Sequence, residues 1–418
     1  APPGAGKSTL VPLALLDEPW AAGGRIVLLE PRRIAARSTA RRMAALLGER
    51  VGETVGYRTR GDTMVSAKTR IEVVTEGILT RMLQSDPSLE GVAAVLFDEF
   101  HERSVHADLG LALALEARSL FREQLRLVVM SATIDAERVA ELLGDAAVVR
   151  AQGRMFPVET HYAERTRGGE SAETAAARAV IGALRAHPEG DVLVFLPGGG
   201  EIRRCAAELM RLGLPAEARI APLYGALTAE EQDEAVAPSR PGERKIVLAT
   251  DIAETSLTVE GVRIVVDAGL RRVPRFSPRT GLTRLETVPV TLASADQRRG
   301  RAGRIAPGVC YRLWTQEEHR RLEPFSEPEL LVSDLAPVAL ELAIWGAPDP
   351  AALAWLDPPP EGAFRQAMEL LRLLGAVDAR GTATEHGRLM AELGAHPRLA
   401  HMILLAMADG RGDLACEL

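Results

Sequence analysis

The chain has 418 residues, of which 47% are hydrophobic and 26% charged, and its formal net charge is −7. That length exceeds what one ordinary hydrophobic core needs, so two or three domains are expected, and the composition excludes a disordered chain. No run of about 18 apolar residues occurs, so neither a membrane span nor a membrane partner is expected. The acidic balance excludes a surface that is basic throughout.

The cysteines favour a reduced compartment. Cys205, Cys310 and Cys416 lack the spacing of a metal site and are expected to be buried and inert. No signal peptide is visible, so a cytoplasmic location is expected, and the expected state is a monomer.

The first 150 residues alternate short apolar runs with longer helical stretches. Strands are predicted at 26–29, 71–74, 92–97 and 127–130, and helices at 35–47 and 109–120. The near-continuous apolar runs are typical of strands that are buried on both faces. The pattern therefore predicts an α/β lobe with a parallel sheet and crossover helices, over residues 1–153.

The same scheme returns after a Gly- and Pro-containing linker at 152–157. Strands are predicted at 192–196, 246–249 and 264–266, and helices at 171–186 and 201–212. Residues 271–290 have no helical period and contain turn residues, which predicts an extended β-hairpin. We expect a second parallel-sheet lobe over residues 154–317.

From about residue 318 the pattern becomes helical. Helices are predicted at 330–345, 362–374, 385–393 and 399–407, with a turn into a short strand at 374–378. This order favours a small winged-helix-like domain over 318–390 and a further helical domain from 391 to 418.

The start of the chain has the residues of a phosphate-binding loop: Gly4, Ala5, Gly6, Lys7, Ser8 and Thr9. Glycines let backbone N–H groups approach phosphate oxygens, and the N-terminus of the following helix favours an anion. Lys7 is expected to reach the β- and γ-phosphates of ATP, and Ser8 to bind Mg²⁺. A chance glycine-rich turn is the alternative.

Consecutive acids follow the strand predicted at 92–97. Asp98 is expected to hold Mg²⁺ through water, and Glu99 to orient or deprotonate the attacking water. His101 is expected to touch the opposite lobe, although a purely structural histidine remains open. Ser131 and Thr133, after the strand at 127–130, are expected to couple the state of the nucleotide to these residues; an ordinary strand end is the alternative.

The second half carries an arginine-rich stretch at 297–304. Gln297, Arg301 and Arg304 lie four and three residues apart, so one helical face would bring them to a single phosphate. Guanidinium groups stabilise charge on a transferring phosphoryl group. A basic patch for nucleic acid or solvent is the alternative.

Taken in order, these motifs resemble those of the DEAH-box superfamily 2 ATP-dependent helicases, and most closely the bacterial HrpB-type branch. Seven segments carry the resemblance, at 31–36, 75–77, 98–103, 131–133, 195–198, 248–258 and 297–304. Phe100 replaces the alanine of the family name, as it does in HrpB-type proteins. The resemblance covers essentially the whole chain.

The resemblance implies two RecA-like lobes, a winged helix and the start of a ratchet-like domain. It implies nucleic-acid-stimulated hydrolysis of ATP with Mg²⁺ and 3′-to-5′ movement on single-stranded RNA, with DNA also open. Arg32 and Thr75 in one lobe and Thr250 in the other would hold RNA phosphates. Asp251 would lie near the ribose or link the lobes, Arg42 would stack on the base, and the hairpin would act as a wedge.

The resemblance also bears on base selectivity. Relatives place an aromatic residue near the start of the hairpin segment, where this chain has Leu270. Loose base selectivity, and use of other nucleoside triphosphates besides ATP, is the expectation that follows.

Two other functions remain open on the sequence alone. One is a P-loop ATPase that remodels a protein or ribonucleoprotein without processive unwinding. The other is a nucleic-acid-binding module whose ATP site only switches affinity. The arginine cluster at 32–42 and the segment 250–256 disfavour the first function, and Glu99 with the arginines of 297–304 disfavours the second.

Overall fold

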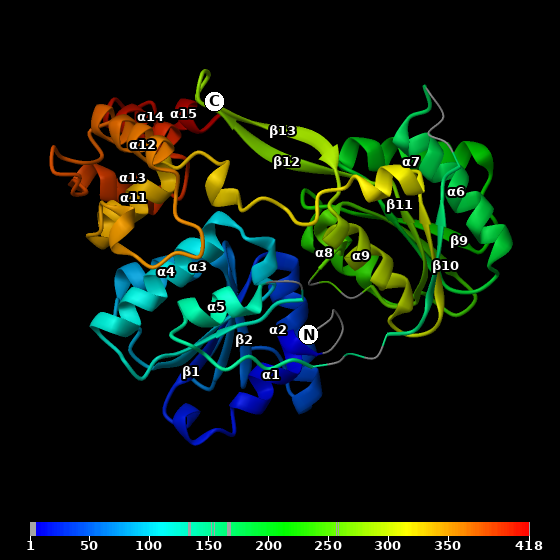
Figure 1. Ribbon diagram of the computed structural model, residues 1–418, viewed down its shortest axis with the longest axis horizontal. Coiled ribbons are helices and arrows are strands. Elements are labelled where there is room, and N and C mark those ends of the chain that lie inside the picture. Colours follow the sequence, from blue (N-terminus) through cyan, green and yellow to red (C-terminus); the bar gives the residue numbers. More distant parts are fainter. Residues whose placement is uncertain are drawn as a thin grey trace.

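The computed structural model describes residues 6–132, 135–151, 153, 155–164, 169–255, 257 and 259–417. Figure 1 shows two α/β lobes, a helical region beside the first lobe, and a long hairpin that leaves the second lobe. None of the helices in the described part of the chain has the length and apolar character that crossing a bilayer requires.

Lobe 1 is built on a six-stranded sheet in the order β3-β2-β4-β1-β5-β6. Its strands are β1 (Arg25–Glu30), β2 (Val55–Thr59), β3 (Asp62–Met64), β4 (Ile71–Thr75), β5 (Val92–Phe97) and β6 (Arg126–Val129). All neighbours pair in parallel except β3, which runs antiparallel to β2.

The helices of lobe 1 cover both faces of this sheet. They are α1 (Lys7–Leu15), α2 (Arg33–Leu47), α3 (Glu76–Ser85), α4 (Val105–Leu120) and α5 (Ala136–Leu142), with short 3₁₀-helices at Pro19–Ala21 and Phe100–Glu102. Side chains from α2 pack on one face and those from α3 and α4 on the other. Because both faces are covered, the central strands β1 and β5 are largely apolar.

Lobe 2 has a second six-stranded sheet, in the order β7-β14-β11-β8-β10-β9, with all neighbours parallel. Its strands are β7 (Val158–Tyr162), β8 (Asp191–Phe195), β9 (Ala218–Leu223), β10 (Arg244–Ala249), β11 (Val262–Asp267) and β14 (Gly308–Arg312). Its helices are α6 (Ala172–Ala186), α7 (Gly199–Leu212), α8 (Ala229–Val236) and α9 (Leu292–Gly300), with 3₁₀-helices at Asp251–Ala253 and Arg301–Gly303.

The hairpin consists of β12 (Leu270–Ser277) and β13 (Leu282–Pro289), paired antiparallel in full register. It starts directly after β11 and extends away from lobe 2 toward the helical region (Figure 1). At its tip, a Cβ built on Gly281 would lie 3.0 Å from a guanidinium nitrogen of Arg398 in α14. The hairpin therefore bridges lobe 2 and the helical region.

The C-terminal part is helical, as the sequence predicts. Its helices are α10 (Gln316–Arg320), α11 (Ala336–Trp345), α12 (Glu361–Leu373), α13 (Glu385–Leu393), α14 (Pro397–Ala408) and α15 (Gly412–Glu417), with 3₁₀-helices at Glu329–Leu331 and Pro350–Ala352. A single antiparallel bridge, Val377 to Ala383, lies between α12 and α13. The winged-helix assignment of this region stays a prediction.

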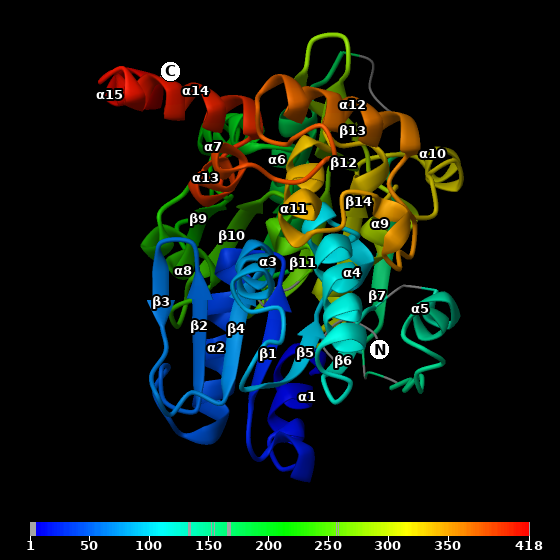
Figure 2. The same ribbon diagram turned by 90° about the vertical axis from the view of Figure 1, so that its left-hand side faces the viewer.

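One hydrophobic core joins lobe 1 to the helical region. Leu79 of α3 and Leu113 of α4 belong to the same buried cluster as Leu340 of α11 and Phe364 of α12. Figure 2 shows α11 lying against α4, with α12 above them. Lobe 2 has separate clusters on the two faces of its own sheet.

The predicted fold class, α/β with two parallel-sheet lobes, is confirmed, and each strand predicted from an apolar run is present. Two details were wrong. The helix predicted at 330–345 is broken, because α11 starts only at Ala336, where Asp334 accepts a hydrogen bond from the Ala336 N–H and Pro337 occupies the first turn. Cys416 is exposed rather than buried, whereas burial raises the pKa of the Cys205 and Cys310 thiols to about 12.

Candidate nucleotide site between the lobes

The N-terminus of α1 forms the first wall of the site. Gly6 precedes the helix with φ 81° and ψ 14°, a left-handed conformation that favours glycine. Its carbonyl accepts hydrogen bonds from the N–H groups of Thr9 (3.2 Å) and Leu10 (2.7 Å). Lys7, Ser8 and Thr9 therefore occupy the first turn, where N–H groups face outward. Gly4 and Ala5 lie outside the described residues.

The turn after β5 forms the second wall. Asp98 Oδ1 accepts a hydrogen bond from the Glu99 N–H at 2.8 Å, and the Asp98 carboxylate is also hydrogen-bonded to Ser8. Glu99 has φ 48°, which is rare for a residue with a side chain. The Phe100 N–H donates to the Met130 carbonyl (3.2 Å), which ties this turn to the end of β6, next to Ser131.

Burial sets the electrostatics of this wall. It raises the pKa of Asp98 to about 7, with the Glu99 carboxylate as the next cause. Burial and the Glu102 carboxylate also raise the pKa of Glu99, and burial lowers the pKa of Lys7. Lys7 counteracts the shifts of both acids, so the cation and the two carboxylates lie close together.

Asp98 and Ser8 fit a magnesium ion. The Asp98 Oδ2 atom is buried and has no hydrogen-bond partner among the described residues. A carboxylate oxygen beside a hydroxyl, next to an anion-binding helix N-terminus, is the donor set that Mg²⁺ uses together with nucleotide phosphates.

Lobe 2 presents its arginines to this wall. Burial lowers the pKa of Arg304 to about 10 against the raising effect of Glu99, and the pKa of Arg301 is lowered by burial and by Arg304. Both arginines in turn act on the pKa of Glu99. The structure thus brings Arg301 and Arg304 of lobe 2 within electrostatic reach of Glu99 of lobe 1.

Arg301 has a further set of partners. Its Nε donates to the Glu254 carbonyl at 2.9 Å, and its two terminal nitrogens donate to the carbonyls of Leu257 and Thr255. All three guanidinium nitrogens therefore hold the loop that follows β10. Through these hydrogen bonds Arg301 holds the loop of lobe 2 that faces lobe 1.

Polar contacts join the lobes next to the site. Gln297 Nε2 and His101 Nε2 are 2.8 Å apart, and burial lowers the pKa of His101, so its neutral ring can accept this hydrogen bond. Thr255 donates its hydroxyl hydrogen to Glu102. Ile34 of α2 is buried in the hydrophobic cluster of lobe 2. These lobe-to-lobe contacts lie within a few residues of Glu99.

Arg32 takes part in the same interface. It donates to the Asp251 carbonyl and lies 3.3 Å from a Glu102 carboxylate oxygen and 3.8 Å from an Asp251 carboxylate oxygen. The negative charges of these neighbours raise the pKa of Arg32, although burial opposes the shift. Asp251 was expected to lie near the ribose or to link the lobes, and in this structure it contacts Arg32 of lobe 1.

The remaining predicted residues lie in different places. Thr75 is the last residue of β4 and Thr250 follows β10, so both lie at the carboxyl edges of the two sheets, and both are partly exposed. Arg42 is exposed on α2 and makes no hydrogen bond or ion pair with the residues that the structure describes. Thr133 lies outside the described residues.

The sequence reasoning gave no role to Arg298 and Glu254. Arg298 is fully buried, donates to Glu254 (2.8 Å) and to Asp267 (2.9 Å), and lies over the Phe195 ring. It also donates to the Leu270 carbonyl at the root of the hairpin (3.2 Å). The only available signal was that both residues belong to the motifs at 248–258 and 297–304.

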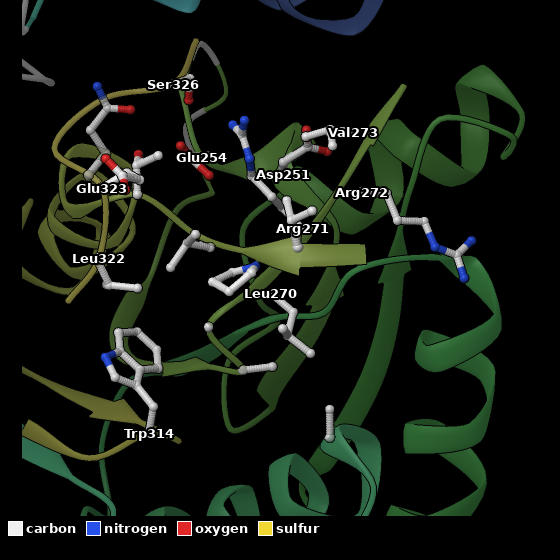
Figure 3. A pocket seen from close by; sticks show the side chains of 18 of the residues that line it. Asp251, Glu254, Leu270, Arg271, Arg272, Val273, Trp314, Leu322, Glu323 and Ser326 are labelled. Atoms are coloured by element: carbon white, nitrogen blue, oxygen red, sulfur yellow. The ribbon is translucent and has the colours of Figure 1, made fainter. Parts of the chain in front are cut away.

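A cavity of 1540 Å³ opens beside these contacts. Its floor contains Arg32 and Glu102 of lobe 1 together with Asp251 of lobe 2, and Figure 3 shows its walls. One wall is the root of the hairpin, and the facing wall is the segment 321–329 between α10 and the 3₁₀-helix Glu329–Leu331.

Comparisons with known proteins agree with this arrangement. The DEAD/DEAH box helicase domain matches residues 1–142, and the helicase conserved C-terminal domain matches residues 175–306. The chain belongs to the DEAD/DEAH box helicases.

Several members of this family are similar over nearly the whole chain. The ATP-dependent RNA helicase HrpB of Escherichia coli is 49% identical over 419 residues, and the HrpA homolog of Haemophilus influenzae is 37% identical over 414. The crystal structure of E. coli HrpB matches with a TM-score of 0.91 over 99% of this chain. The chain spans about half of HrpB (51%) and 32% of the HrpA homolog.

Proposed function

We propose that this chain is the motor part of an ATP-dependent helicase, which hydrolyses ATP between its lobes and moves 3′-to-5′ along single-stranded RNA. The observation that carries the proposal is the approach of Arg301 and Arg304 of lobe 2 to Glu99 of lobe 1. The names of the relatives support an RNA substrate. The direction of movement rests on the family resemblance alone.

In this proposal the two walls share one nucleotide. The first turn of α1 and Lys7 hold the phosphates, and Ser8 and Asp98 hold Mg²⁺, partly through water. The metal would neutralise charge on the phosphate oxygens. Glu99 orients the attacking water and accepts its proton.

Lobe 2 would complete the site. Arg304 and Gln297 stabilise charge on the γ-phosphate, and Arg301 joins them when it exchanges a carbonyl partner for a phosphate oxygen. Asp251 and Arg42 are proposed to contact the ribose and the base. Since Leu270 offers no aromatic ring, other nucleoside triphosphates are expected to serve as substrates.

The proposed RNA contacts explain how hydrolysis becomes movement. Arg32 and Thr75 hold phosphates from lobe 1 and Thr250 holds one from lobe 2, so a shift between the lobes changes the spacing of the contacts. Arg32 would exchange Glu102 and Asp251 for an RNA phosphate. RNA binding and the lobe-to-lobe contact of Arg32 therefore compete.

The domain limits follow the same proposal. Residues 1–153 and 154–317 are the RecA-like lobes, with the hairpin at 271–290 as a wedge. Residues 318–390 are a winged-helix-like domain, and residues 391–418 begin a ratchet-like domain. The proposed setting is a cytoplasmic monomer.

The deciding experiment measures ATP hydrolysis against matched single-stranded RNA and DNA. The proposal predicts that RNA raises the rate and that the stimulation weakens as salt rises, because phosphate contacts release counterions. A rate that neither nucleic acid changes would favour the ATPase that remodels proteins instead.

A substitution tests the assignment of Glu99. Glu99→Gln removes the base and is expected to lower kcat roughly 10²- to 10⁴-fold with ATP binding retained. Glu90→Gln, an exposed acid just before β5, is the matched control and should hydrolyse ATP normally. Near-wild-type turnover by Glu99→Gln would remove Glu99 from the proton-handling role.

A further inference from the structure

The wall of the cavity that faces the hairpin carries an exposed aromatic ring. The chain has eight phenylalanines, all within the described residues, and three are exposed: Phe121 (54%), Phe156 (45%) and Phe325 (63%). Of these three, Phe325 lines the cavity. A large apolar side chain that is exposed inside a cavity favours a ligand with an apolar face.

The backbone before Phe325 is fixed. The N–H groups of Leu292 and Ala293, at the start of α9, donate to the carbonyls of Glu323 (2.8 Å) and Pro324 (3.1 Å). After Phe325, the Glu329 N–H donates to the Arg103 carbonyl of lobe 1 at 3.0 Å. A ring on a segment anchored on both sides loses little conformational entropy when a ligand binds.

The hairpin root provides a cation on the other side of the cavity. The Arg271 Nε atom is buried and has no hydrogen-bond partner among the described residues. Burial raises the pKa of Glu329, and the charge of Arg271 opposes this rise, so the guanidinium lies near that carboxylate. The next hairpin arginine, Arg272, is instead paired with Glu201 (3.2 Å). Figure 3 shows Arg271 at the start of β12.

An aromatic face and an unsatisfied guanidinium on opposing walls match the two parts of a nucleotide. Bases stack on aromatic rings whatever their identity, because each base has a π-face, and guanidinium groups bind phosphate. Glu323 and Glu327 line the wall beside Phe325 and would repel phosphate. The wall with Phe325 is therefore suited to the base, and the wall with Arg271 to the phosphate.

We propose that Phe325 is a stacking platform for one base of the bound single strand, with Arg271 holding a neighbouring phosphate. The inference rests on the proposed function, since it requires a single strand in the cavity. Recognition at this subsite is independent of base identity.

The test uses the chain described here, with a fluorescein-labelled oligoadenylate and fluorescence anisotropy at fixed salt. Phe325→Ala is expected to raise Kd roughly 5- to 150-fold, the loss that accompanies removal of one stacked base. Phe325→Trp should keep the affinity. Phe121→Ala, an equally exposed ring outside the cavity, should bind as the wild type does.

A second measurement separates stacking from other effects. An abasic nucleotide at the stacked position should weaken binding by the wild type but not by Phe325→Ala, because two changes that remove one contact are not additive. Phe325→Ala should keep the slope of log Kd against log salt, whereas Arg271→Gln should reduce it by about one.

The outcomes distinguish the two proposals. If the wild type binds no single strand, the proposed function fails. If the wild type binds and Phe325→Ala binds equally well, the stacking role alone is overturned. The same holds if the losses of affinity caused by the abasic nucleotide and by Phe325→Ala are additive at every position of the oligonucleotide.

Discussion

Glu99 illustrates how single residues are held in an unfavourable state at this interface. Its φ of 48° and its raised pKa both oppose what an isolated glutamate prefers. Arg103, four residues later, has φ 50° as well. Such conformations persist only where the surrounding structure holds them, as the Phe100 bond to the Met130 carbonyl does here. Two of the four described non-glycine residues with positive φ, Glu99 and Arg103, thus flank the turn that presents the carboxylates.

Glu76, at the start of α3, gives a prediction for pH. Burial raises its pKa from 4.5 to about 8, against the hydrogen bond from Ser104 (2.6 Å). An acid whose folded pKa is raised favours the fold only while it is protonated, so stability is lost as pH rises from about 4.5 through about 8. Glu76→Gln should therefore be more stable than the wild type at pH 8.5, by up to about 5 kcal/mol, and close to it near pH 4.5.

Thermal unfolding midpoints at several pH values check this. Glu361→Gln is the control, because the Glu361 side chain is 90% exposed, and it should shift the midpoint equally little at every pH. A Glu76→Gln midpoint that tracks the wild type across the whole range would contradict the prediction.

At the scale of elements, the turn after β5 is anchored to the helical region. Arg103 pairs with Asp357, which precedes α12, at 2.7 Å. Arg103 also pairs with Asp108 of α4 at 3.0 Å. Arg138 of α5 pairs with the same Asp357 at 2.9 Å. The two arginines differ in exposure, since the Arg103 side chain is 11% exposed and that of Arg138 is 51% exposed.

This difference predicts unequal effects of the same substitution. Arg103→Gln should lower the free energy of unfolding by about 1.5–3 kcal/mol, because it leaves the buried Asp108 carboxylate without its charged donor and removes one of the two arginines that pair with Asp357. Arg138→Gln should cost about 0–1 kcal/mol, as surface ion pairs do. Thermal or urea unfolding measures both, and equal losses would show that burial does not govern the strength of this anchor.

The sequence predicted a strand best where a continuous run of apolar residues was the main signal. Residues 92–97 form β5 with the predicted bounds because the strand is apolar and buried throughout. The strands β2, β3, β7, β9 and β14 were missed. Of these, β3, β7 and β9 are edge strands, which carry polar residues and lack a continuous apolar run. The internal strands β2 and β14 also lack such a run, because each contains a glycine and an arginine.

The site was predictable in part. The positions of Asp98, Thr75 and Thr250 after strands follow from the pattern, since parallel strands end at one edge of a sheet. The carbonyl partners of Arg301 and the contact of Arg32 with Asp251 do not, because they depend on how the two lobes pack.

At the scale of the molecule, most contacts between the lobes are polar, apart from Ile34 of α2, which packs into the hydrophobic cluster of lobe 2. Arg41 of α2 and Asp233 of α8 form an exposed pair at 2.7 Å, and Arg37 lies 3.4 Å from Gln232. Such contacts contribute little individually and are easily exchanged. In the proposed function, such weak contacts would let the lobes reorient when the γ-phosphate is bound or released.

Fluorescence energy transfer between labelled lobes checks this. Cysteines replace Glu90 in lobe 1 and Glu230 in lobe 2, both exposed, and Cys416 becomes serine to avoid stray labelling. Transfer efficiency should differ between ADP and a non-hydrolysable ATP analogue, and Arg304→Ala should abolish most of that difference. If the labelled protein that retains Arg304 gives the same transfer efficiency with both nucleotides, a rearrangement that depends on the γ-phosphate is ruled out.

The shared core of lobe 1 and the helical region has a mechanical consequence. Because apolar packing joins lobe 1 to the helical region, these two parts are expected to move as one rigid unit. Lobe 2 is then expected to move relative to that unit. The hairpin belongs to lobe 2, yet its tip lies against Arg398 of the helical region. In the proposed function, each movement of lobe 2 would therefore change the width of the cavity beside the hairpin root, so that the motion proposed to advance RNA would also change the space that holds the strand.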